Sequence, residues 1–148
     1  MTDLAAVMER GLYLSGIPIE RRTPEVCLAA VRNLGGALVF VPKELRTPEM
    51  CLAAVQQAGW ALRYVFFKEQ TPELCLIAVK DDGFALGSVK NEFKTPELCL
   101  VAVKQDGTAL VWVPEKFRTP EMCLAAISQN HEAIEYSPYS FLELMSLA

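Results

Sequence analysis

The stretch RTPEMCLAAVQQAG, residues 46–59, decides the fold of this chain because near copies of it occur at other positions. RTPEVCLAAVRNLG occupies residues 22–35, KTPELCLVAVKQDG residues 94–107 and RTPEMCLAAISQNH residues 118–131. The Thr-Pro pair recurs every 24 residues from Thr23 to Thr119 without an insertion or a deletion. A motif that returns at a fixed spacing indicates a repeated structural unit and not a single catalytic site.

The repeats cover almost the whole chain. The N-terminal residues belong to the series too, because Leu4-Ala5-Ala6-Val7 aligns with Leu28-Ala29-Ala30-Val31. We therefore predict one domain over residues 1–148, made of six repeats, the first of them truncated. The repeats span residues 1–22, 23–46, 47–70, 71–94, 95–118 and 119–142, and a C-terminal cap follows at residues 143–148.

Each unit is predicted to form a helix, a turn and a second, shorter helix. Thr is a good N-cap, and Pro fits the first helical position, where no N–H is needed. The Glu that follows complements the positive end of the helix dipole. The apolar run after it, as in residues 50–55, covers all sides of the helix and so predicts a helix packed on every side. Gly35, Gly59, Gly83 and Gly107 are predicted to end these helices in the left-handed conformation.

The second segment of a unit, such as residues 61–65, is too short to be stable alone, so each unit depends on its neighbours. We expect this segment to be a short α-helix or a 3₁₀ helix. The predicted fold class is all-α: a short right-handed α-solenoid of six 24-residue helix-turn-helix repeats.

The string LAAVQQAGWALRYV, residues 52–65, and Glu44-Leu45-Arg46 before the next unit resemble a family of bacterial and viral repeats. That family is a domain of unknown function with units like VLAAVKQNGxALxYASEELR. The usual charged residues before the first helix are replaced here by Thr-Pro-Glu. The unit length is also similar to that of the leucine-rich variant repeats, and this likeness implies alternating α and 3₁₀ helices. Neither resemblance implies a catalytic residue or a ligand.

Composition narrows the class of protein. The chain has 148 residues, of which 52% are hydrophobic, but no stretch is long and apolar enough to span a membrane, and the start lacks a signal pattern. We expect a soluble cytoplasmic protein. The formal net charge is −4, and residues 119–148 hold four Glu and no Lys or Arg, so the net charge belongs to the C-terminal end.

The cysteines and the single histidine are interpreted as structural. Equivalent positions on packed helices lie ~8–10 Å apart, too far for disulfides, so we expect buried free thiols at Cys27, Cys51, Cys75, Cys99 and Cys123. His131 replaces the turn glycine of the last unit, and His tolerates a left-handed turn. The first-turn Glu residues are interpreted as partners of Arg22, Arg46, Lys94 and Arg118. We expect no enzyme activity, no cofactor and no metal site, because like residues are spread along a line instead of converging.

Departures from the repeat are the candidates for a partner site. Trp60, Tyr64 and Phe67 are spaced i, i+4, i+7, on the face of the second helix opposite its apolar residues. Gly87-Ser88 replaces bulkier pairs in the next unit, with Phe84 alongside, which predicts a shallow aromatic-rimmed depression. Trp112 belongs to an aromatic column with Tyr64 and Tyr136. The alternative is that these rings only cover seams between units.

The second candidate region is the acidic last unit, where Glu132, Glu135 and Tyr136 are expected to form a patch for a basic partner, or a solubilising cap. The function that we predict is a non-enzymatic protein–protein interaction module presenting an extended repeat surface. The alternatives are a small acidic inhibitor or immunity-type protein that blocks a basic site, a nucleic-acid-binding repeat protein, and a structural spacer. The expected state is a monomer or a weak homodimer through the C-terminal cap.

Overall fold

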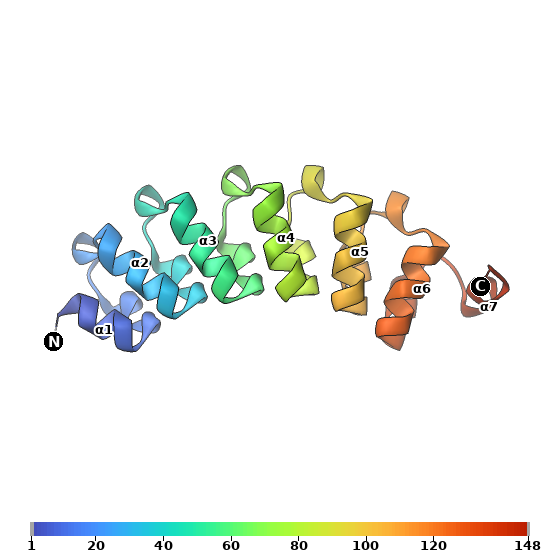
Figure 1. Ribbon diagram of the computed structural model, residues 1–148, viewed down its shortest axis with the longest axis horizontal. Coiled ribbons are helices and arrows are strands. Elements are labelled where there is room, and N and C mark those ends of the chain that lie inside the picture. Colours follow the sequence, from blue (N-terminus) through green and yellow to red (C-terminus); the bar gives the residue numbers. More distant parts are fainter. Residues whose placement is uncertain (1, 148) are drawn as a thin grey trace. The chain divides into compact units, whose positions relative to one another are not determined.

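The computed structural model describes residues 2–147, and every regular element in that range is a helix (Figure 1). The α-helices are α1 (Asp3–Glu9), α2 (Pro24–Asn33), α3 (Pro48–Gln57), α4 (Pro72–Asp81), α5 (Pro96–Gln105), α6 (Pro120–Gln129) and α7 (Phe141–Leu147). Six-residue 3₁₀ helices follow α1 to α6, namely η1 (Gly11–Gly16), η3 (Gly35–Phe40), η5 (Gly59–Tyr64), η7 (Gly83–Ser88), η9 (Gly107–Trp112) and η11 (His131–Tyr136). The predicted all-α helical repeat is confirmed, and its second helix is a 3₁₀ helix.

A third short helix, which the sequence did not predict, completes most repeats. These single 3₁₀ turns are η2 (Ile19–Arg21), η4 (Lys43–Leu45), η6 (Phe67–Glu69), η8 (Asn91–Phe93) and η10 (Glu115–Phe117). Each one leads the chain back to the Thr that begins the next long helix.

Contacts group the chain into two compact units, each of which holds several repeats. The first unit ends at Glu69, and the second unit begins at Gln70. In the first unit α1 packs on α2 and α2 on α3, while η1, η3 and η5 pack in the same order. In the second unit α4, α5 and α6 form one row, η7, η9 and η11 form another, and α7 packs on α6. Figure 1 shows the long helices side by side within each unit.

The long helices begin as the sequence predicts. In α2 the Oγ of Thr23 accepts a hydrogen bond from the backbone N–H of Val26 at 3.3 Å, and Pro24 is the first helical residue. Thr47, Thr71, Thr95 and Thr119 cap α3 to α6 in the same way. The cap satisfies a backbone N–H that has no partner within the helix, so each Thr fixes the first residue of its helix.

The core of each repeat lies between the row of long helices and the row of 3₁₀ helices. Buried positions recur in one repeat after another. They are the Cys, Ala and Val of the long helix and the Ala and Leu of the 3₁₀ helix, as at Cys75, Ala78, Val79, Ala85 and Leu86. The Leu that follows each Cys is different, since Leu52 is 38% exposed and Leu76 is 36% exposed. The expectation that the long helix is packed on every side is therefore wrong, and one stripe of it is open to solvent.

The glycines that follow the long helices have another role than the predicted one. No residue between Thr2 and Leu147 has a positive φ, so these glycines do not end their helices in the left-handed conformation. A Cβ at Gly35 would lie 2.4 Å from the carbonyl oxygen of Ala54. A Cβ at Gly83 would lie 2.4 Å from that of Ala102. Glycine is required because the backbone of the next long helix approaches too closely for any side chain.

The exposed His131 occupies this glycine position in the last repeat. Its tolerance of a left-handed turn is not the reason, because its 3₁₀ helix has no positive φ either. After η11 the chain forms the short α7 instead of another ten-residue helix beginning with Thr-Pro. His131 is thus not followed by a ten-residue helix of the kind whose backbone excludes a side chain at Gly35, Gly83 and Gly107.

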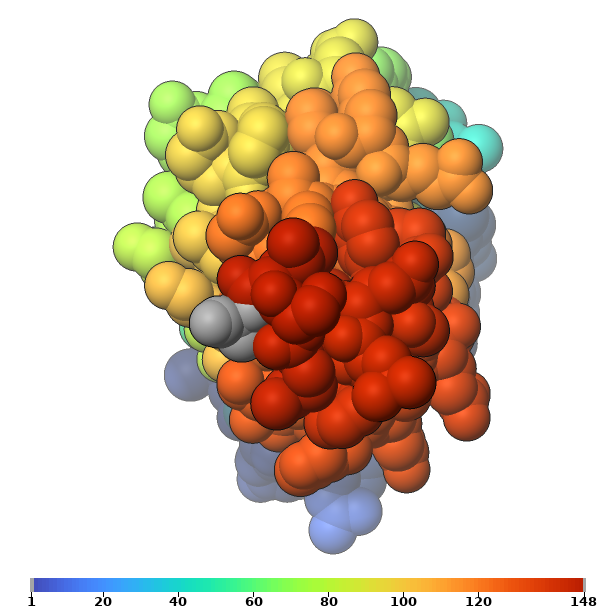
Figure 2. Space-filling model, turned by 90° about the vertical axis from the view of Figure 1, so that its right-hand side faces the viewer, coloured from blue at the N-terminus to red at the C-terminus, as the bar shows by residue number. Residues whose placement is uncertain are grey.

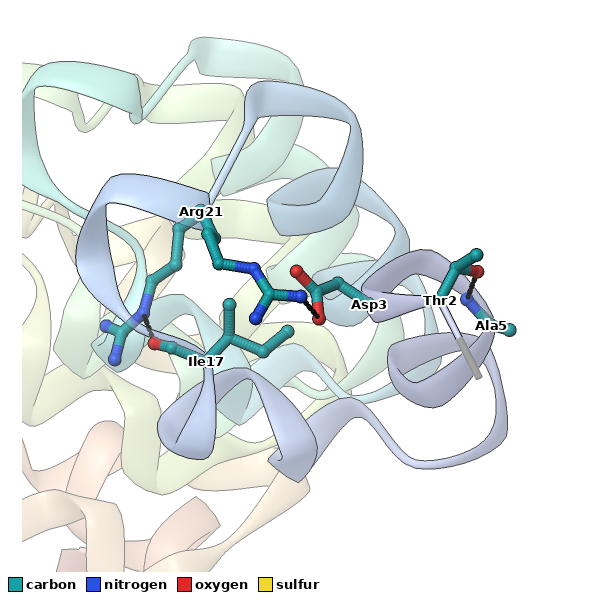
Figure 3. Close-up of polar contacts among 6 residues, drawn as sticks. Thr2, Asp3, Ala5, Ile17 and Arg21 are labelled. Carbon is teal, nitrogen blue, oxygen red and sulfur yellow. Dashed lines mark hydrogen bonds and ion pairs between the residues drawn. The ribbon is translucent and has the colours of Figure 1, made fainter.

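The basic residue before each Thr also differs from its prediction. Arg118 does not pair with a first-turn Glu but donates to three backbone carbonyl oxygens, those of Val113 at 2.9 Å, Tyr136 at 3.0 Å and Val111 at 3.2 Å. Arg22 likewise donates to the carbonyls of Ser15, Ile17 and Phe40, and Figure 3 includes the bond to Ile17 beside the ion pair of Arg21 with Asp3. These arginines bind the end of their own 3₁₀ helix to the end of the next one.

Other members of this column make the same connection with fewer bonds. Arg46 donates to the carbonyl of Tyr64 at 2.7 Å, and the ammonium of Lys94 reaches that of Trp112 at 3.4 Å. Gln70 donates to the carbonyl of Ser88 at 2.7 Å and is itself 4% exposed. The first-turn Glu49 pairs instead with Arg32 on α2, at 2.7 Å.

A second column of side chains joins neighbouring repeats through side-chain amides. The carboxamide of Gln105 accepts a hydrogen bond from the N–H of Gly83 at 2.7 Å and donates to the carbonyl of Asp81 at 3.0 Å. Asn33 binds Gly11 and Met8 in the same manner. These bonds satisfy backbone groups at the end of the preceding long helix, so the column stabilises the stack.

Candidate functional site

Trp60 and Tyr64 lie together at η5 in the first unit. Their rings meet edge to face with centroids 6.1 Å apart, and Trp60 is 42% exposed. Trp60 also covers Gly36, where a Cβ would lie 2.7 Å from the indole ring. The predicted i, i+4, i+7 face is wrong, because η5 ends at Tyr64 and Phe67 begins the separate helix η6, where it is 63% exposed. Much of the Trp60 surface thus serves to cover the neighbouring repeat.

Phe84 and Trp112 form a similar pair in the second unit. Their rings meet edge to face with centroids 5.6 Å apart. The indole of Trp112 lies over Gly87, where a Cβ would approach it to 2.8 Å. The predicted depression at Gly87-Ser88 is therefore wrong, because the ring of Trp112 occupies that space. Trp112 and Phe84 remain 39% and 45% exposed, so their outer edges stay accessible.

The acidic end of the molecule carries exposed carboxylates. Glu132 and Glu135 are exposed on η11, and neither forms an ion pair with any residue from Thr2 to Leu147. Tyr136 is half-buried, and its backbone carbonyl is bound by Arg118. The two glutamates therefore remain candidates for contact with a basic partner, whereas Tyr136 contributes through its backbone to the fold.

The helix α7 covers the last repeat with a single side chain. Leu144 is 1% exposed, whereas Phe141, Leu142, Met145 and Leu147 are 57% exposed or more. Figure 2 views the molecule from this end, where the dark red residues of α7 face the viewer. Ser140 and Glu143 begin the helix with reciprocal hydrogen bonds. The bonds that the N–H and the hydroxyl of Ser140 donate to the carboxylate lower the pKa of Glu143. The helix α7 thus lies on the last repeat with an apolar outer face, and it begins at Phe141, before the predicted cap at residues 143–148; Ala148 lies outside the described residues.

Two pockets on the long helices of the second unit were not predicted. The α4/α5 pocket has a volume of about 230 Å³ and the α5/α6 pocket one of about 210 Å³. The first is lined by Pro72, Leu76, Phe93, Thr95, Glu97, Leu98 and Val101. The second is lined by Pro96, Glu97, Leu100, Thr119, Glu121 and Met122. Both are mainly apolar, and both open on the solvent-exposed stripe of their helices.

The sequence contains a signal for this site at aliphatic positions, away from the aromatic residues. The position after the first-column Leu is alanine in four repeats, at Ala5, Ala29, Ala53 and Ala125, but it is Ile77 in α4 and Val101 in α5. All six side chains are partly exposed, so core packing does not demand the larger ones. The apolar stripe is therefore widest on the two helices that carry the α4/α5 pocket.

The charges at the rim of these pockets are acidic. Glu97 borders both pockets and Glu121 borders the second, and no Lys, Arg or His lines either of them. The basic residues that flank the long helices are directed elsewhere, as Lys94 and Arg118 bind backbone carbonyls. Lys80 lies one turn beyond Leu76 and does not line the pocket.

The five cysteines are buried and free, as predicted. Burial raises the pKa of the thiols of Cys75 and Cys99 to about 11. The pKa of Cys51 also rises to about 11, through burial first and then the carboxylate of Glu69, whose oxygen lies 3.9 Å from the sulfur. Burial raises the pKa of Cys27 and Cys123 as well. Thiols of this kind are poor nucleophiles, because the reactive thiolate is scarce.

We expect these thiols to react with dithionitrobenzoate at pH 8 at least ~100-fold more slowly in the folded protein than in urea, since burial suppresses both thiolate and access. The folded pKa lies above the ordinary value of 9.0, so the stability that depends on protonated thiols is complete below pH 9 and is lost as pH rises toward 11. Urea unfolding at pH 7 and pH 10.5 measures this loss. Rapid modification of all five thiols at pH 8 in the native protein would contradict the buried ladder.

Among residues 2–147 no three His, Cys, Asp or Glu side chains are grouped so as to hold a metal ion. No helix within that range has the length and apolar character needed to cross a membrane.

Comparison with known proteins places this repeat in a family. The family described as "Domain of unknown function (DUF4116)" matches residues 23–69, 71–118 and 96–142. Neither the curated proteins nor the solved structures contain a match to the chain. The three matches span five of the predicted repeats, from Thr23 to Leu142, and agree with the resemblance seen in the repeated LAAV and Gly-x-Ala-Leu strings. The chain therefore belongs to the DUF4116 family of uncharacterised helical repeats.

Proposed function

We propose that this chain is a non-enzymatic module that binds another protein through the exposed stripe of its long helices. The observation that carries the proposal is the pair of apolar pockets on α4, α5 and α6, which the fold leaves open. The buried Cys, Ala and Val columns already form the core, so the core does not require the partly exposed Leu76, Ile77 and Val101. Apolar pockets with few polar groups are typical of surfaces that receive side chains of a partner.

Catalysis is a weaker proposal for the same surface. A catalytic site needs unlike polar groups that converge on one reacting atom. The polar side chains that line the two pockets are Glu97, Glu121 and two Thr N-caps. The hydroxyls of these Thr residues are already bound to backbone N–H groups. The pockets therefore favour binding.

The test is a capture experiment with immobilised protein and lysate of the source cells. We expect the Leu76→Ser/Leu100→Ser variant to retain ~10-fold less of the proteins that wild type retains, because one anchor position is removed from each pocket. Leu52→Ser is the matched control, since Leu52 belongs to the same column, is 38% exposed and lines neither pocket. Equal capture by the double variant and by the control would refute the proposed site.

A second candidate function uses the acidic end. The exposed, unpaired carboxylates of Glu132 and Glu135 suit a small inhibitor or immunity-type protein that covers a basic site. Glu132→Lys/Glu135→Lys, included in the same capture experiment, separates the two candidates. If this variant alone loses the captured proteins, the acidic end is the binding site. A spacer without a specific partner predicts no difference among any of these proteins.

The remaining parts of the proposal concern location and assembly. Five free thiols fit a reducing compartment such as the cytoplasm. The apolar outer face of α7 suits a weak homodimer through the C-terminal cap, which light scattering at increasing concentration measures. Binding of nucleic acid is disfavoured by the acidic net charge and by the ion pair that engages Arg32.

A further inference from the structure

The two pockets are equivalent positions of successive repeats. Pro72 and Leu76 of the α4/α5 pocket correspond to Pro96 and Leu100 of the α5/α6 pocket, 24 residues later. Glu97 and Leu98 correspond in the same way to Glu121 and Met122. Such a pair is suited to a ligand whose own side chains repeat at the spacing of the helices.

We propose that the two pockets together receive an extended, basic peptide segment of polyproline II type, with apolar side chains at positions i and i+3. This inference rests on the proposed protein-binding function and names the chemistry of the partner. Packed helices lie ~8–10 Å apart, which sets the separation of the pockets. A polyproline II segment has three residues per turn and rises ~3.1 Å per residue, so its residues i and i+3 point the same way ~9 Å apart.

Other peptide conformations fit the spacing less well. In a β-strand, side chains on one face are separated by ~7 Å or, at the next step, by ~13 Å, and neither value matches the helix spacing. An α-helix brings i and i+7 to ~10 Å, but it also presents i+3 and i+4 between them, where the ridge of α5 lies. The polyproline II segment places no side chain between its two anchors on that face.

The charge of the segment follows from the rim. Glu97 stands between the two pockets and Glu121 borders the second, and neither carboxylate forms an ion pair with a described residue. The equivalent Glu49 of the first unit is neutralised by Arg32. Lys or Arg at i+2 would point to one side of the face that carries the anchors, and its long side chain would reach the carboxylate of Glu97 at the rim.

The chain's own C-terminal segment is not this occupant. Its exposed apolar side chains have a suitable character, but residues 119–148 contain four Glu and no Lys or Arg. Like charges at the rim would oppose its binding to the pockets. The complementary partner is a separate, basic chain.

The probe is the fluorescein-labelled peptide Lys-Leu-Pro-Lys-Leu-Pro-Lys amide, whose Leu residues are three positions apart. We expect fluorescence polarisation to show binding ~10-fold tighter than that of a peptide with Glu in place of Lys. The same advantage is expected over Lys-Leu-Pro-Pro-Lys-Leu-Pro-Lys amide, in which one extra Pro separates the anchors. Each tenfold step corresponds to loss of about one good contact.

Variants of the protein locate the binding. Glu97→Gln/Glu121→Gln is expected to weaken probe binding ~10-fold while melting as wild type does, because both side chains are exposed. Glu49→Gln in the first unit is the matched control and should leave binding unchanged. Equal affinity for the basic and acidic peptides, indifference to the Leu spacing, or no effect of the double Gln variant would each overturn the inference.

The result is separable from the proposed function. If the captured proteins depend on Leu76 and Leu100 but the basic probe does not bind, the partner chemistry is wrong and the protein-binding function stands. If the probe binds as described but capture is insensitive to both leucines, the peptide site is real and the proposed function of that site is wrong.

Discussion

Gly107→Ala will lower the free energy of unfolding by about 3 kcal/mol or more, because a Cβ at this position collides with backbone and not with a movable side chain. That Cβ would lie 2.2 Å from the carbonyl oxygen of Ala126 and 2.9 Å from the backbone nitrogen of Asn130. Accommodating it requires α6 to move away from η9, which would also break the bond from Gly107 to the carboxamide of Gln129. Urea unfolding followed by circular dichroism at 222 nm measures the loss.

Two controls separate the close approach from a general intolerance of side chains. A Cβ at Gly16 would have no atom within 4 Å, so Gly16→Ala should change stability by at most about 1 kcal/mol, in the stabilising direction. His131→Gly should also have a small effect, since the last repeat already accepts a large side chain there. A Gly107→Ala protein as stable as Gly16→Ala would show that the carbonyl approach is not a constraint.

The second large effect is expected for Arg118→Ala, which should cost about 2–3 kcal/mol, because hydrogen bonds to a charged donor are lost at three backbone carbonyls. The deleted guanidinium is the connection between the end of η9 and the end of η11. Arg118→Lys is expected to recover part of the loss, as the natural Lys94 reaches a single carbonyl. Thermal and urea unfolding of the three proteins give the ranking.

Arg32→Ala is the matched control for the loss of an arginine. Arg32 pairs with Glu49, but both side chains are 62% exposed, so the pair should contribute less than about 1 kcal/mol. If Arg32→Ala and Arg118→Ala lower the free energy of unfolding equally, the carbonyl contacts of Arg118 contribute no more to stability than an exposed ion pair does.

The helical repeat could be predicted because its determinants are local. Thr followed by Pro fixes a helix start, and a constant period of 24 residues fixes the stacking unit, whatever the rest of the chain does. The sequence also shows that glycine follows each long helix, but it does not show why glycine is needed there. A left-handed turn and a close carbonyl both demand glycine, and only the arrangement of the next helix distinguishes them.

The contacts of the arginine column were out of reach for a similar reason. A sequence shows Arg46 and Glu49 three residues apart, which suggests an ion pair, but it does not show where backbone carbonyls are left without partners. The 3₁₀ helices end with such carbonyls, and the arginines bind them. Backbone acceptors occur at every residue, so their use leaves no mark in the composition.

The candidate site was only partly accessible from the sequence. A departure from the repeat drew attention to Trp60, and a recurring aromatic column to Trp112. Each indole, however, covers a glycine in the preceding repeat, and this is a relation between two positions that neither position shows alone. The pockets are formed largely by Leu and Pro that obey the repeat, so a search for departures alone does not find them. The larger side chains of Ile77 and Val101 were the available signal.

The glycine column also governs how such a chain can lengthen. A tandem duplication of residues 95–118 would bring its own Arg or Lys, Gln and Gly to the new junction, so the added layer would be accepted without any change elsewhere. Duplication of residues 119–142 would instead carry His131 into an interior layer, against the carbonyl of a following helix. Tandem duplication can therefore lengthen the array through its inner repeats but not through its last repeat.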